Sequence, residues 1–360
     1  MRIAVITCYF DPDYVRARSL RAALKTIPDV KITVVKNRHK GMLRYPEVAM
    51  KLWKMRQNRP DVYLLTFRGQ EILPLVLMLS GKKPVWFDEF IVPIAYASGE
   101  KHRKSFAIRV KHFLARVSEP LYKRWLQKCQ VILADTAAHA ELSAKVSQVN
   151  LSKYTAVPVG TDEKLFVPAI KDERPITPFR VFYYSTGMQP LHGIPVVMAA
   201  AEELQDDPDI EFLIVGGKKP MEAVATVAKS RGANVHYVPW IPFEDLVPTI
   251  QAASLCLGGP FGDTPQAHHV ITGKSYQFLA CERPVLVGAG EATNEFFVDK
   301  TNALMVPQGD ADALAKAIKW AKAHPDELKT IAANGRKLYE KEFSTAAIAR
   351  RLKPLVDAVS

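Results

Sequence analysis

Short apolar runs rich in β-branched residues alternate with stretches of helical spacing along most of this sequence. In the first half the runs predict strands at 2–10, 31–36, 61–67, 84–90 and 130–136, and residues 15–27 have the spacing of an amphipathic helix. Strands that are apolar on both faces need helices on both faces. The rhythm therefore predicts a parallel sheet covered on either side, which is the α/β class.

The same rhythm begins again after a segment without periodicity. Residues 158–178 contain four prolines and mixed charges, which is typical of a linker. Beyond it the sequence predicts strands at 179–186, 211–217, 234–240, 254–259, 283–288 and 303–307, with helices at 194–204, 311–323 and 344–359. We expect two Rossmann-like doubly wound domains that face a central cleft. Their expected bounds are 1–165 and 166–343, with a terminal helix at 344–360 that can pack back on the N-terminal domain.

The positive charge of the chain is concentrated in its first half. The 360 residues carry a net charge of +12, from 49 Lys and Arg and 37 Asp and Glu. Residues 1–160 hold 28 basic and 12 acidic residues, whereas residues 161–360 hold 21 and 25. This asymmetry predicts an anionic partner for the N-terminal domain only.

The sequence shows no sign of a membrane span or a leader. No segment approaches the ~20 apolar residues that a spanning helix needs, and the first residues have the pattern of a strand. The four cysteines are scattered without CxxC spacing, which fits a reducing compartment and disfavours zinc knuckles. We expect a cytoplasmic protein that can be peripheral on the inner face of the cell membrane.

Glycines follow three predicted strands of the second half. Gly187 comes after 179–186, Gly216 and Gly217 end 211–217, and Gly258 and Gly259 end 254–259. Such glycines let the backbone approach a ligand, and the free N–H groups of the next helix can bind phosphate. An ordinary turn explains any one of them, but three at one sheet edge favour a ligand site.

Lys274 lies in the first turn of a helix that Thr272 can cap. The helix dipole disfavours a cation there, and a bound diphosphate would reverse that penalty. A solvated surface lysine is the alternative. Asp263 and Thr264, beside Gly262, can hydrogen-bond sugar hydroxyls or simply form a turn.

We expect no metal site and no dinucleotide cofactor. His268 and His269 are adjacent, so their side chains do not easily face one ion, and no carboxylate stands at ligand spacing. A GxGxxG pattern after the first strand and a GxxxxGK[ST] pattern are both missing.

Between about residues 130 and 345 the sequence resembles the retaining glycosyltransferases of family 4, which have the GT-B fold. The pieces that match in order are 157–168, 185–204, 212–217, 235–257, 274–288 and 302–318. The resemblance implies transfer of a sugar from a UDP- or GDP-linked nucleotide-diphosphate sugar, with retention of anomeric configuration. It also implies that no metal or other cofactor takes part.

The resemblance further implies a set of donor-binding residues. Gly187 matches the glycine loop beside the donor phosphates, and His192–Gly193 match a Lys-Gly pair, so that Lys274 would help to supply the lost positive charge. Residues 237–241 match the loop that frames the nucleobase. The expected donor set is Gly187, His192, Gly193, Gly217, Lys218, Val238, Trp240, Ile241, Asp263, Thr264, His269, Lys274 and Gln277.

The family signature is two glutamates eight positions apart, one of which contacts the donor sugar and the other the ribose. His269 and Gln277 stand at these positions. Both can bond hydroxyl groups, but neither is anionic at neutral pH when His269 is unprotonated. The departure leaves the donor sugar open and makes an inactive or altered enzyme an alternative.

Asp88 and Glu89 end a predicted strand where the family places a His or Asp near the reacting carbon. We expect this pair to be catalytic, with Asp88 orienting or deprotonating the acceptor hydroxyl. A helix N-cap or a surface pair is the alternative.

Residues 100–128 have the pattern of a basic amphipathic helix that Pro120 kinks or ends. Between 101 and 128 there are nine Lys and Arg and one acidic residue, Glu119. Such a helix predicts contact with an anionic membrane surface, or else packs its apolar stripe in the core and exposes its charges to water. The expected acceptor or membrane contacts are Arg16, Arg18, Arg103, Lys104, Arg109 and Lys111.

We therefore expect a glycosyltransferase whose acceptor is a lipid-linked glycan or another cell-envelope glycolipid. A sugar-nucleotide epimerase or hydrolase on the same fold is one alternative, and a non-catalytic nucleotide-sugar-binding protein is another. Nucleic acid is not an expected partner, because the sequence has no RNP-type, zinc-finger or helix-turn-helix motif.

Overall fold

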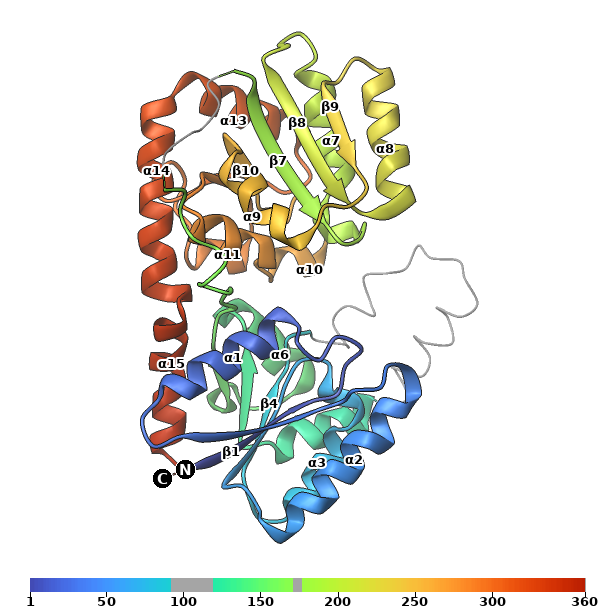
Figure 1. The fold of residues 1–360 in the computed structure, drawn as a ribbon, viewed down its shortest axis with the longest axis vertical. Coiled ribbons are helices and arrows are strands. Elements are labelled where there is room, and N and C mark those ends of the chain that lie inside the picture. Colours follow the sequence, from blue (N-terminus) through green and yellow to red (C-terminus); the bar gives the residue numbers. More distant parts are fainter. Residues whose placement is uncertain (92–118, 171–176, 360) are drawn as a thin grey trace. The chain divides into compact units, whose positions relative to one another are not determined.

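The computed structural model describes residues 1–91, 119–170 and 177–359. The chain forms two compact units, Met1–Gly160 with Thr345–Ser360, and Thr161–Ser344. Each unit is built on one six-stranded parallel sheet with helices on its faces (Figure 1). The expected α/β class with two doubly wound sheets is confirmed.

The sheet of the first unit has the strand order β2-β1-β3-β4-β5-β6. Its strands are β1 (Arg2–Thr7), β2 (Lys31–Lys36), β3 (Val62–Leu65), β4 (Val85–Asp88), β5 (Val131–Ala134) and β6 (Tyr154–Ala156). All neighbours pair in parallel, so the carboxyl ends of the strands lie at one edge. The sequence pattern did not predict β6, because three residues are too few to show a periodicity.

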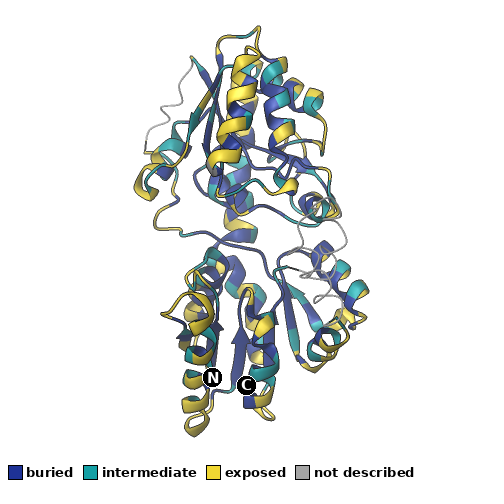
Figure 2. Cartoon of the chain, turned by 90° about the vertical axis from the view of Figure 1, so that its right-hand side faces the viewer, coloured by how far each residue is buried: buried dark blue, intermediate teal, exposed yellow. Residues whose placement is uncertain are grey.

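Helices cover both faces of this first sheet. They are α1 (Val15–Thr26), α2 (Arg44–Lys54), α3 (Leu73–Ser80), α6 (Ala137–Ser147) and α15 (Thr345–Asp357), and residues 119–128 are also helical. Apolar residues of α2, α3, α6 and 119–128 share one core with one face of the sheet. The other face is covered by α1 and α15, whose Leu20 and Leu352 are fully buried. Figure 2 shows the buried strands between these partly exposed helices.

The second unit repeats the design with the strand order β12-β11-β10-β7-β8-β9. Its strands are β7 (Phe179–Ser185), β8 (Ile210–Gly216), β9 (Val235–Val238), β10 (Leu255–Leu257), β11 (Val285–Ala289) and β12 (Leu304–Pro307). From β7 the chain continues to β8 and β9 on one side, and from β10 it continues to β11 and β12 on the other side. The neighbouring strands β7 and β10 therefore flank the switch point of the sheet. Ligands of doubly wound sheets bind at the carboxyl ends of such strands.

The helices of the second unit follow its strands in turn. They are α7 (Ile194–Glu203), α8 (Lys218–Ser230), α9 (Phe243–Gln251), α10 (Pro265–His268), α11 (Gly273–Ala280), α12 (Glu291–Asn294), α13 (Ala311–Ala323) and α14 (Pro325–Leu338). Over the described ranges, no helix combines the length and the apolar composition that crossing a membrane requires.

The last helix of the chain belongs to the core of the first unit. In α15, Ile348 and Leu352 are fully buried beside Ile3 and Trp86, and the helix packs against α1 (Figure 1). The apolar positions 348, 352 and 356 recur at the spacing of one helical face, which explains why this face is covered.

We expect Leu352→Ala to lower the free energy of unfolding by about 2–5 kcal/mol, because it removes a fully buried side chain and leaves a cavity. Denaturant unfolding followed by tryptophan fluorescence measures this, since Trp86 lies in the same core. The matched control is the exposed neighbour Lys353, for which substitution by alanine should change the value by no more than about 0.5 kcal/mol. Equal effects of the two substitutions would contradict the packing of α15.

Candidate functional site

Two loops meet closely at the switch point of the second sheet. The loop after β7 ends at the 3-10 turn Pro190–His192 and at Gly193, which has a φ of +64° and stands at the N-cap of α7. A Cβ on Gly193 would lie 2.3 Å from the backbone nitrogen of Gly262 in the loop after β10, and a Cβ on Gly262 would meet the carbonyl of Pro190. Glycine is therefore required at both positions for the two loops to pass.

Lys274 is buried beneath these loops. Its side chain extends from the first turn of α11, only 6 % of its surface is exposed, and its Nζ lies 4.0 Å from the centroid of the Tyr183 ring. Among the residues that the structure describes, no carboxylate pairs with this ammonium group. Burial lowers the pKa of Lys274 to about 7. The alternative of a solvated surface lysine is therefore wrong.

His192 adds a second unsatisfied group at this place. Its Nδ1 is buried and has no hydrogen-bond partner within the described part of the chain. Burial, with the charge of Lys274 as a further cause, lowers the pKa of His192 to about 3, so that the ring is neutral. A buried cation and a buried ring nitrogen without partners both cost free energy, and an anion would satisfy the cation.

The start of α11 is fixed by hydrogen bonds to the neighbouring strand. Thr272 stands at the N-cap position, but its hydroxyl donates to the carbonyl of Gly258 at 2.5 Å, lies 3.2 Å from the Ser275 hydroxyl, and accepts no bond from a backbone N–H of the helix. The expectation of a side-chain cap is thus wrong in detail, because the hydroxyl ties the helix to the end of β10. Gly258 is required here, since a Cβ would lie 2.5 Å from the Ser275 hydroxyl.

His269 and Gln277, at the two positions of the glutamate signature, both have partners. The Nδ1 of His269 lies 2.8 Å from the carbonyl of Pro265, and its Nε2 lies 3.1 Å from the Oε2 of Glu291. Gln277 accepts a hydrogen bond from the Tyr184 hydroxyl. The exposed carboxylate of Glu291, at the start of α12, thus lies beside the position where the family has its first glutamate.

Asp263 and Thr264 form a helix start at the carboxyl edge of β10. The hydroxyl of Thr264 accepts from the N–H of Ala267 and caps α10. Asp263 lies 3.1 Å from the Nε2 of His268 and keeps 70 % of its side chain exposed. Thr264 therefore serves the turn, whereas the exposed Asp263 is available to a ligand.

The other expected donor residues also lie after strands of this sheet. Gly187 follows β7 with open space at its Cα, and Gly217 caps α8, which Lys218 begins. Val238 ends β9, Trp240 and Ile241 follow it, and Trp240 is 71 % exposed. All thirteen expected donor residues are thus in the second unit, at the end of β9 or on segments that follow β7, β8, β9 or β10.

In the first unit, Asp88 ends β4 and is neutralised by Arg16 of α1. Arg16 donates from Nε at 2.9 Å and from Nη2 at 2.8 Å to one carboxylate oxygen, and the N–H of Phe67 donates to the other at 3.2 Å. Arg16 also donates to the carbonyls of Val157 and Pro158. Both side chains of the pair have no exposed surface.

This burial corrects two expectations. Arg16 has no exposed surface with which to reach a membrane or an acceptor, because its guanidinium joins β4 to the segment after β6. Asp88 is likewise neither an N-cap nor a surface residue, and its carboxylate is already paired. The Arg16–Asp88 pair therefore positions the segments that it joins, which are α1, the end of β4 and the segment after β6.

Glu89 is buried in a different network. It accepts hydrogen bonds from the hydroxyls of Tyr122, at 2.6 Å, and Ser143, and the Tyr154 hydroxyl lies 3.4 Å away. Burial raises the pKa of Glu89 above the usual value of a glutamate. Beside it His139, in the first turn of α6, bonds through Nδ1 to Asp135, while its Nε2 is buried and unpartnered among the described residues.

The sequence analysis missed the His139–Asp135 pair, although its i, i+4 spacing after a predicted strand was a signal that could have found it. Burial alone would lower the pKa of His139, but the Asp135 carboxylate outweighs burial and the pKa is raised. The pair therefore adds a second charged element at the carboxyl edge of the first sheet.

An aromatic cluster that the sequence analysis also missed lies at the same edge. Tyr14 stacks on Phe67 with ring centroids 4.7 Å apart, and Tyr9 and Phe90 meet the Phe67 ring edge-on at 5.0 and 5.1 Å. The guanidinium of Arg68 lies 5.9 Å from the ring centroids of both Tyr9 and Phe67. Arg68 is exposed, has a φ of +56°, and pairs with no carboxylate in the described ranges.

Several expected contacts remain without a structural description. Arg103, Lys104, Arg109 and Lys111 lie outside the described residues. Arg18 is half-buried in α1.

Within residues 1–91, 119–170 and 177–359, no group of three or more His, Cys, Asp or Glu side chains is placed to hold a metal ion.

Comparison with known proteins places the fold. Residues 197–353 match the model of a family described as "Glycosyl transferase-like". None of the curated proteins compared with the sequence matches it.

Solved structures align over nearly the whole chain. HepE from Anabaena in complex with UDP is 13 % identical with a TM-score of 0.74, and covers 99 % of this chain and 100 % of its own. Sucrose-phosphate synthase from Thermosynechococcus elongatus is 18 % identical with a TM-score of 0.72, and covers 100 % and 99 %. The lipopolysaccharide outer core galactosyltransferase WaaB is 12 % identical with a TM-score of 0.64, and covers 99 % of both chains. The fold is that of GT-B glycosyltransferases.

Breaking the buried pair in the first unit should be costly. We expect Arg16→Met to lower the free energy of unfolding by about 3–5 kcal/mol, because it leaves the Asp88 carboxylate buried without a counter-charge. Urea denaturation measures this. Lys36→Met, which breaks the exposed pair with Asp13, is the control and should cost no more than about 1 kcal/mol. If Arg16→Met unfolded at the same urea concentration as the control, the structural role of the pair would be refuted.

Proposed function

We propose that this protein is a retaining glycosyltransferase of the family 4 type that transfers a sugar from a UDP- or GDP-linked donor to an anionic, lipid-linked glycan or another cell-envelope glycolipid. It would act in the cytoplasm at the inner face of the membrane and without a metal. The observation that carries this proposal is the buried ammonium group of Lys274, which has no carboxylate partner and lies at the switch point of the second sheet.

A diphosphate is the ligand that fits this environment best. A buried cation without a counter-charge is unfavourable, and a doubly charged phosphate beside it would remove that penalty. Gly193 and Gly217 cap α7 and α8 without any side-chain bond. Pro195 and Pro220 have no N–H group, but the backbone N–H groups of Ile194, Lys218 and Lys219 can join Lys274 in holding phosphate oxygens. His192, which is neutral, can contribute one hydrogen bond from its unpartnered ring nitrogen.

The other donor residues would bind the parts of the nucleotide sugar on either side of the diphosphate. Residues 237–241, among which Trp240 is exposed, would frame the nucleobase, and the Gln277 amide, held by Tyr184, would contact the ribose. His269 would contact the sugar together with Glu291, whose carboxylate is 3.1 Å from the imidazole. We infer that Glu291 supplies the negative charge that the family normally takes from a glutamate at position 269.

The chemistry requires charge stabilisation at two points. As the bond between the sugar and the diphosphate breaks, negative charge grows on the leaving group, and the Lys274 ammonium stabilises it. Positive charge grows on the sugar ring, and the carboxylate of Glu291 can balance it. Asp88 is already paired with Arg16, so we assign it a role in orienting groups at the carboxyl edge of β4 rather than that of a free base.

The acceptor would bind the first unit. Stacked aromatic rings bind the apolar faces of sugars, and a guanidinium without a carboxylate partner binds phosphate. The cluster of Tyr9, Tyr14, Phe67 and Phe90 with the exposed Arg68 offers both properties at one sheet edge. This combination of aromatic rings and a cation favours an acceptor that is a glycan with a phosphate group.

The comparisons support the same assignment. The structural neighbour HepE has been crystallised with UDP and with UDP-glucose, and WaaB is a galactosyltransferase of the lipopolysaccharide outer core. The match to the glycosyl transferase-like family covers residues 197–353, which include most of α7 and Lys274.

The protonation of Lys274 predicts how nucleotide binding depends on pH. The pKa of about 7 in the free protein should rise when a diphosphate binds, so that binding takes up a proton above pH 7. The affinity for UDP or GDP should therefore fall as the pH rises from 7 to 9, by up to tenfold per pH unit. Isothermal titration calorimetry measures the dissociation constant across this range.

Two variants separate this effect from a general influence of pH. Lys274→Met should bind the nucleotide roughly 10- to 100-fold more weakly at pH 7 and show little dependence on pH, because the linked proton is gone. Lys229→Met, an exposed lysine of α8, should behave like the wild type. The same pH dependence in Lys274→Met as in the wild type would contradict the assignment.

The transfer reaction itself can be tested directly. Incubation with labelled UDP- and GDP-sugars and lipid-linked acceptors should give a labelled glycolipid and release nucleotide only when the acceptor is present. Glu291→Gln should lower the rate by about 10²–10³-fold if its carboxylate balances the charge on the ring, while Glu295→Gln on the same segment should not. Nucleotide release without acceptor would indicate a hydrolase or epimerase, and binding without turnover would indicate a non-catalytic protein. Either result would overturn the proposal.

A further inference from the structure

The outer surface of one helical layer in the first unit exposes large apolar side chains. Met42 and Leu43, which precede α2, are 77 % and 64 % exposed, Trp53 of α2 is 61 % exposed, and Met78 of α3 is 69 % exposed. We call this surface the α2–α3 face and define it by Met42, Leu43, Met50, Trp53, Met78 and Leu121. The helices that carry these residues pack their opposite sides into one core, so they cover the same side of the sheet.

Helical geometry explains why these side chains point to solvent. In α2, Tyr45, Val48 and Leu52 recur at spacings of three and four and pack on the core. Met50 and Trp53 lie three residues apart on another side of the helix. The helix therefore has two apolar stripes, of which only one is covered within the unit.

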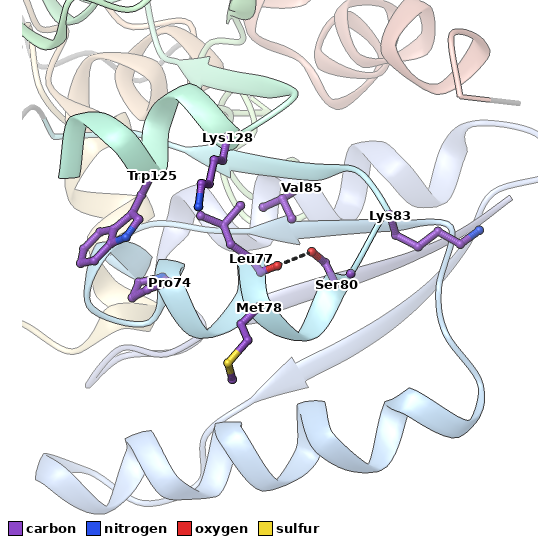
Figure 3. Close-up of a pocket in the computed structure, with 9 residues that line it drawn as sticks. Pro74, Leu77, Met78, Ser80, Lys83, Val85, Trp125 and Lys128 are labelled. Atoms are coloured by element: carbon purple, nitrogen blue, oxygen red, sulfur yellow. Dashed lines mark hydrogen bonds between the residues drawn. The ribbon is translucent and has the colours of Figure 1, made fainter. Parts of the chain in front are cut away.

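A hollow of about 520 Å³ opens beside α3 on this layer (Figure 3). Pro74, Leu77 and Met78 line it from α3, and Trp125 and Lys128 line it from the helical residues 119–128. Lys83 and Lys128 also line the hollow, and a lining of apolar side chains and lysines suits an amphipathic molecule, in which a hydrocarbon chain adjoins an anionic group.

The segments that carry this face are rich in basic residues, of which Lys54 and Arg56 are exposed. Residues 38–59 contain seven Lys and Arg and one acidic residue, Glu47, and residues 119–128 contain three basic residues and one acidic residue. The guanidinium of Arg56 lies over the ring of Trp53, 4.6 Å from its centroid. Long basic side chains can keep their charges in water while their methylene groups cover apolar surface, as they do at a membrane interface.

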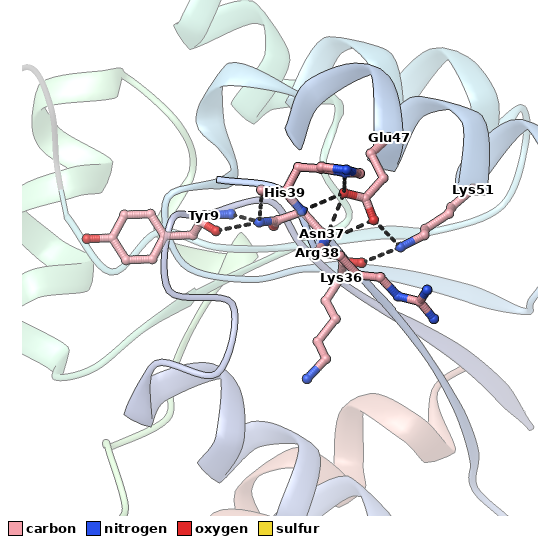
Figure 4. Close-up of polar contacts among 7 residues, drawn as sticks. All are labelled: Tyr9, Lys36, Asn37, Arg38, His39, Glu47 and Lys51. Carbon is pink, nitrogen blue, oxygen red and sulfur yellow. Dashed lines mark hydrogen bonds and ion pairs between the residues drawn. The ribbon is translucent and has the colours of Figure 1, made fainter. Parts of the chain in front are cut away.

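Glu47 holds the loop that presents the end of this face. Its carboxylate accepts the backbone N–H groups of Arg38 and His39 at 2.9 and 3.0 Å and also bonds Lys51, so that the segment before α2 is tied to the helix (Figure 4). Because β2 ends at Lys36 and this loop follows it, Met42 and Leu43 lie near the carboxyl edge of the sheet.

We propose that the α2–α3 face docks the protein on an anionic lipid bilayer. The exposed Met, Leu and Trp side chains would enter the interfacial region while the surrounding lysines and arginines bind acidic headgroups. The charge excludes a second copy as the occupant, since a two-fold interface would place one basic face against another. The face leads toward the edge of the aromatic cluster, so a lipid-linked acceptor would reach that cluster from the membrane. That last step rests on the proposed function.

Sedimentation with vesicles tests the docking without any donor or acceptor. The full chain should bind phosphatidylcholine vesicles that contain phosphatidylglycerol, bind weakly or not at all to pure phosphatidylcholine, and dissociate as salt rises. Trp53→Ala with Met78→Ala should weaken the partition coefficient at least tenfold. Lys54→Gln with Arg56→Gln should weaken it about thirtyfold. All four side chains are exposed, so circular dichroism and thermal unfolding should remain those of the wild type.

The matched control replaces exposed apolar residues of the second unit. Val227→Ala with Val298→Ala should leave vesicle binding unchanged. The proposal is overturned if the wild type fails to bind the acidic vesicles, or if the control loses as much affinity as the Trp53 and Met78 variant. It is also overturned if ultracentrifugation shows a dimer that the Trp53 and Met78 substitutions dissociate. Each result would leave the nucleotide-binding test of Lys274 untouched, because calorimetry with UDP or GDP uses neither vesicles nor an acceptor.

Discussion

In the second unit, a single buried lysine determines which ligand the site can accept. Lys274 lies beneath the loops after β7 and β10, above an aromatic ring and without a carboxylate partner among the described residues. Such a group raises the free energy of the folded state, and its pKa of about 7 reflects that cost. A bound anion would explain three features around this lysine. Glycines bring the two loops together, the helix starts carry free N–H groups, and His192 has a ring nitrogen without a partner among the described residues.

In the first unit, by contrast, the buried charged groups of the described residues have partners. Arg16 and Asp88 neutralise each other, Asp135 pairs with His139, and Glu89 receives hydrogen bonds from hydroxyl groups. These networks join the segments at the carboxyl edge of the sheet, and the described residues of this unit include no unpaired buried cation like Lys274. Its proposed ligand-binding groups are exposed instead: the aromatic rings with Arg68 at the sheet edge, and the side chains of the α2–α3 face. In our proposal the second unit binds a compact diphosphate and the first an extended amphipathic acceptor.

Sequence patterns predicted the architecture because strand and helix periodicities are local. The repeated rhythm located eleven of the twelve strands and missed only the three-residue β6. Long-range contacts carry no such signal: the partner of Asp88 lies 72 residues away. The position of Lys274 near a helix start could be predicted, but its burial depends on loops from other strands. The approach of Glu291 to His269 likewise depends on how α10 and α12 pack, which no local pattern encodes.

In our proposal Lys274 is a buried cation whose charge binds a diphosphate. Nuclear magnetic resonance can measure that charge directly. With lysine side chains labelled with ¹³C, the resonance that disappears in Lys274→Met should titrate near pH 7 in the free protein. Saturation with UDP or GDP should move that titration upward toward the ordinary lysine value of 10.5. An ordinary pKa in the free protein, or a pKa near 7 that neither nucleotide changes, would contradict the account.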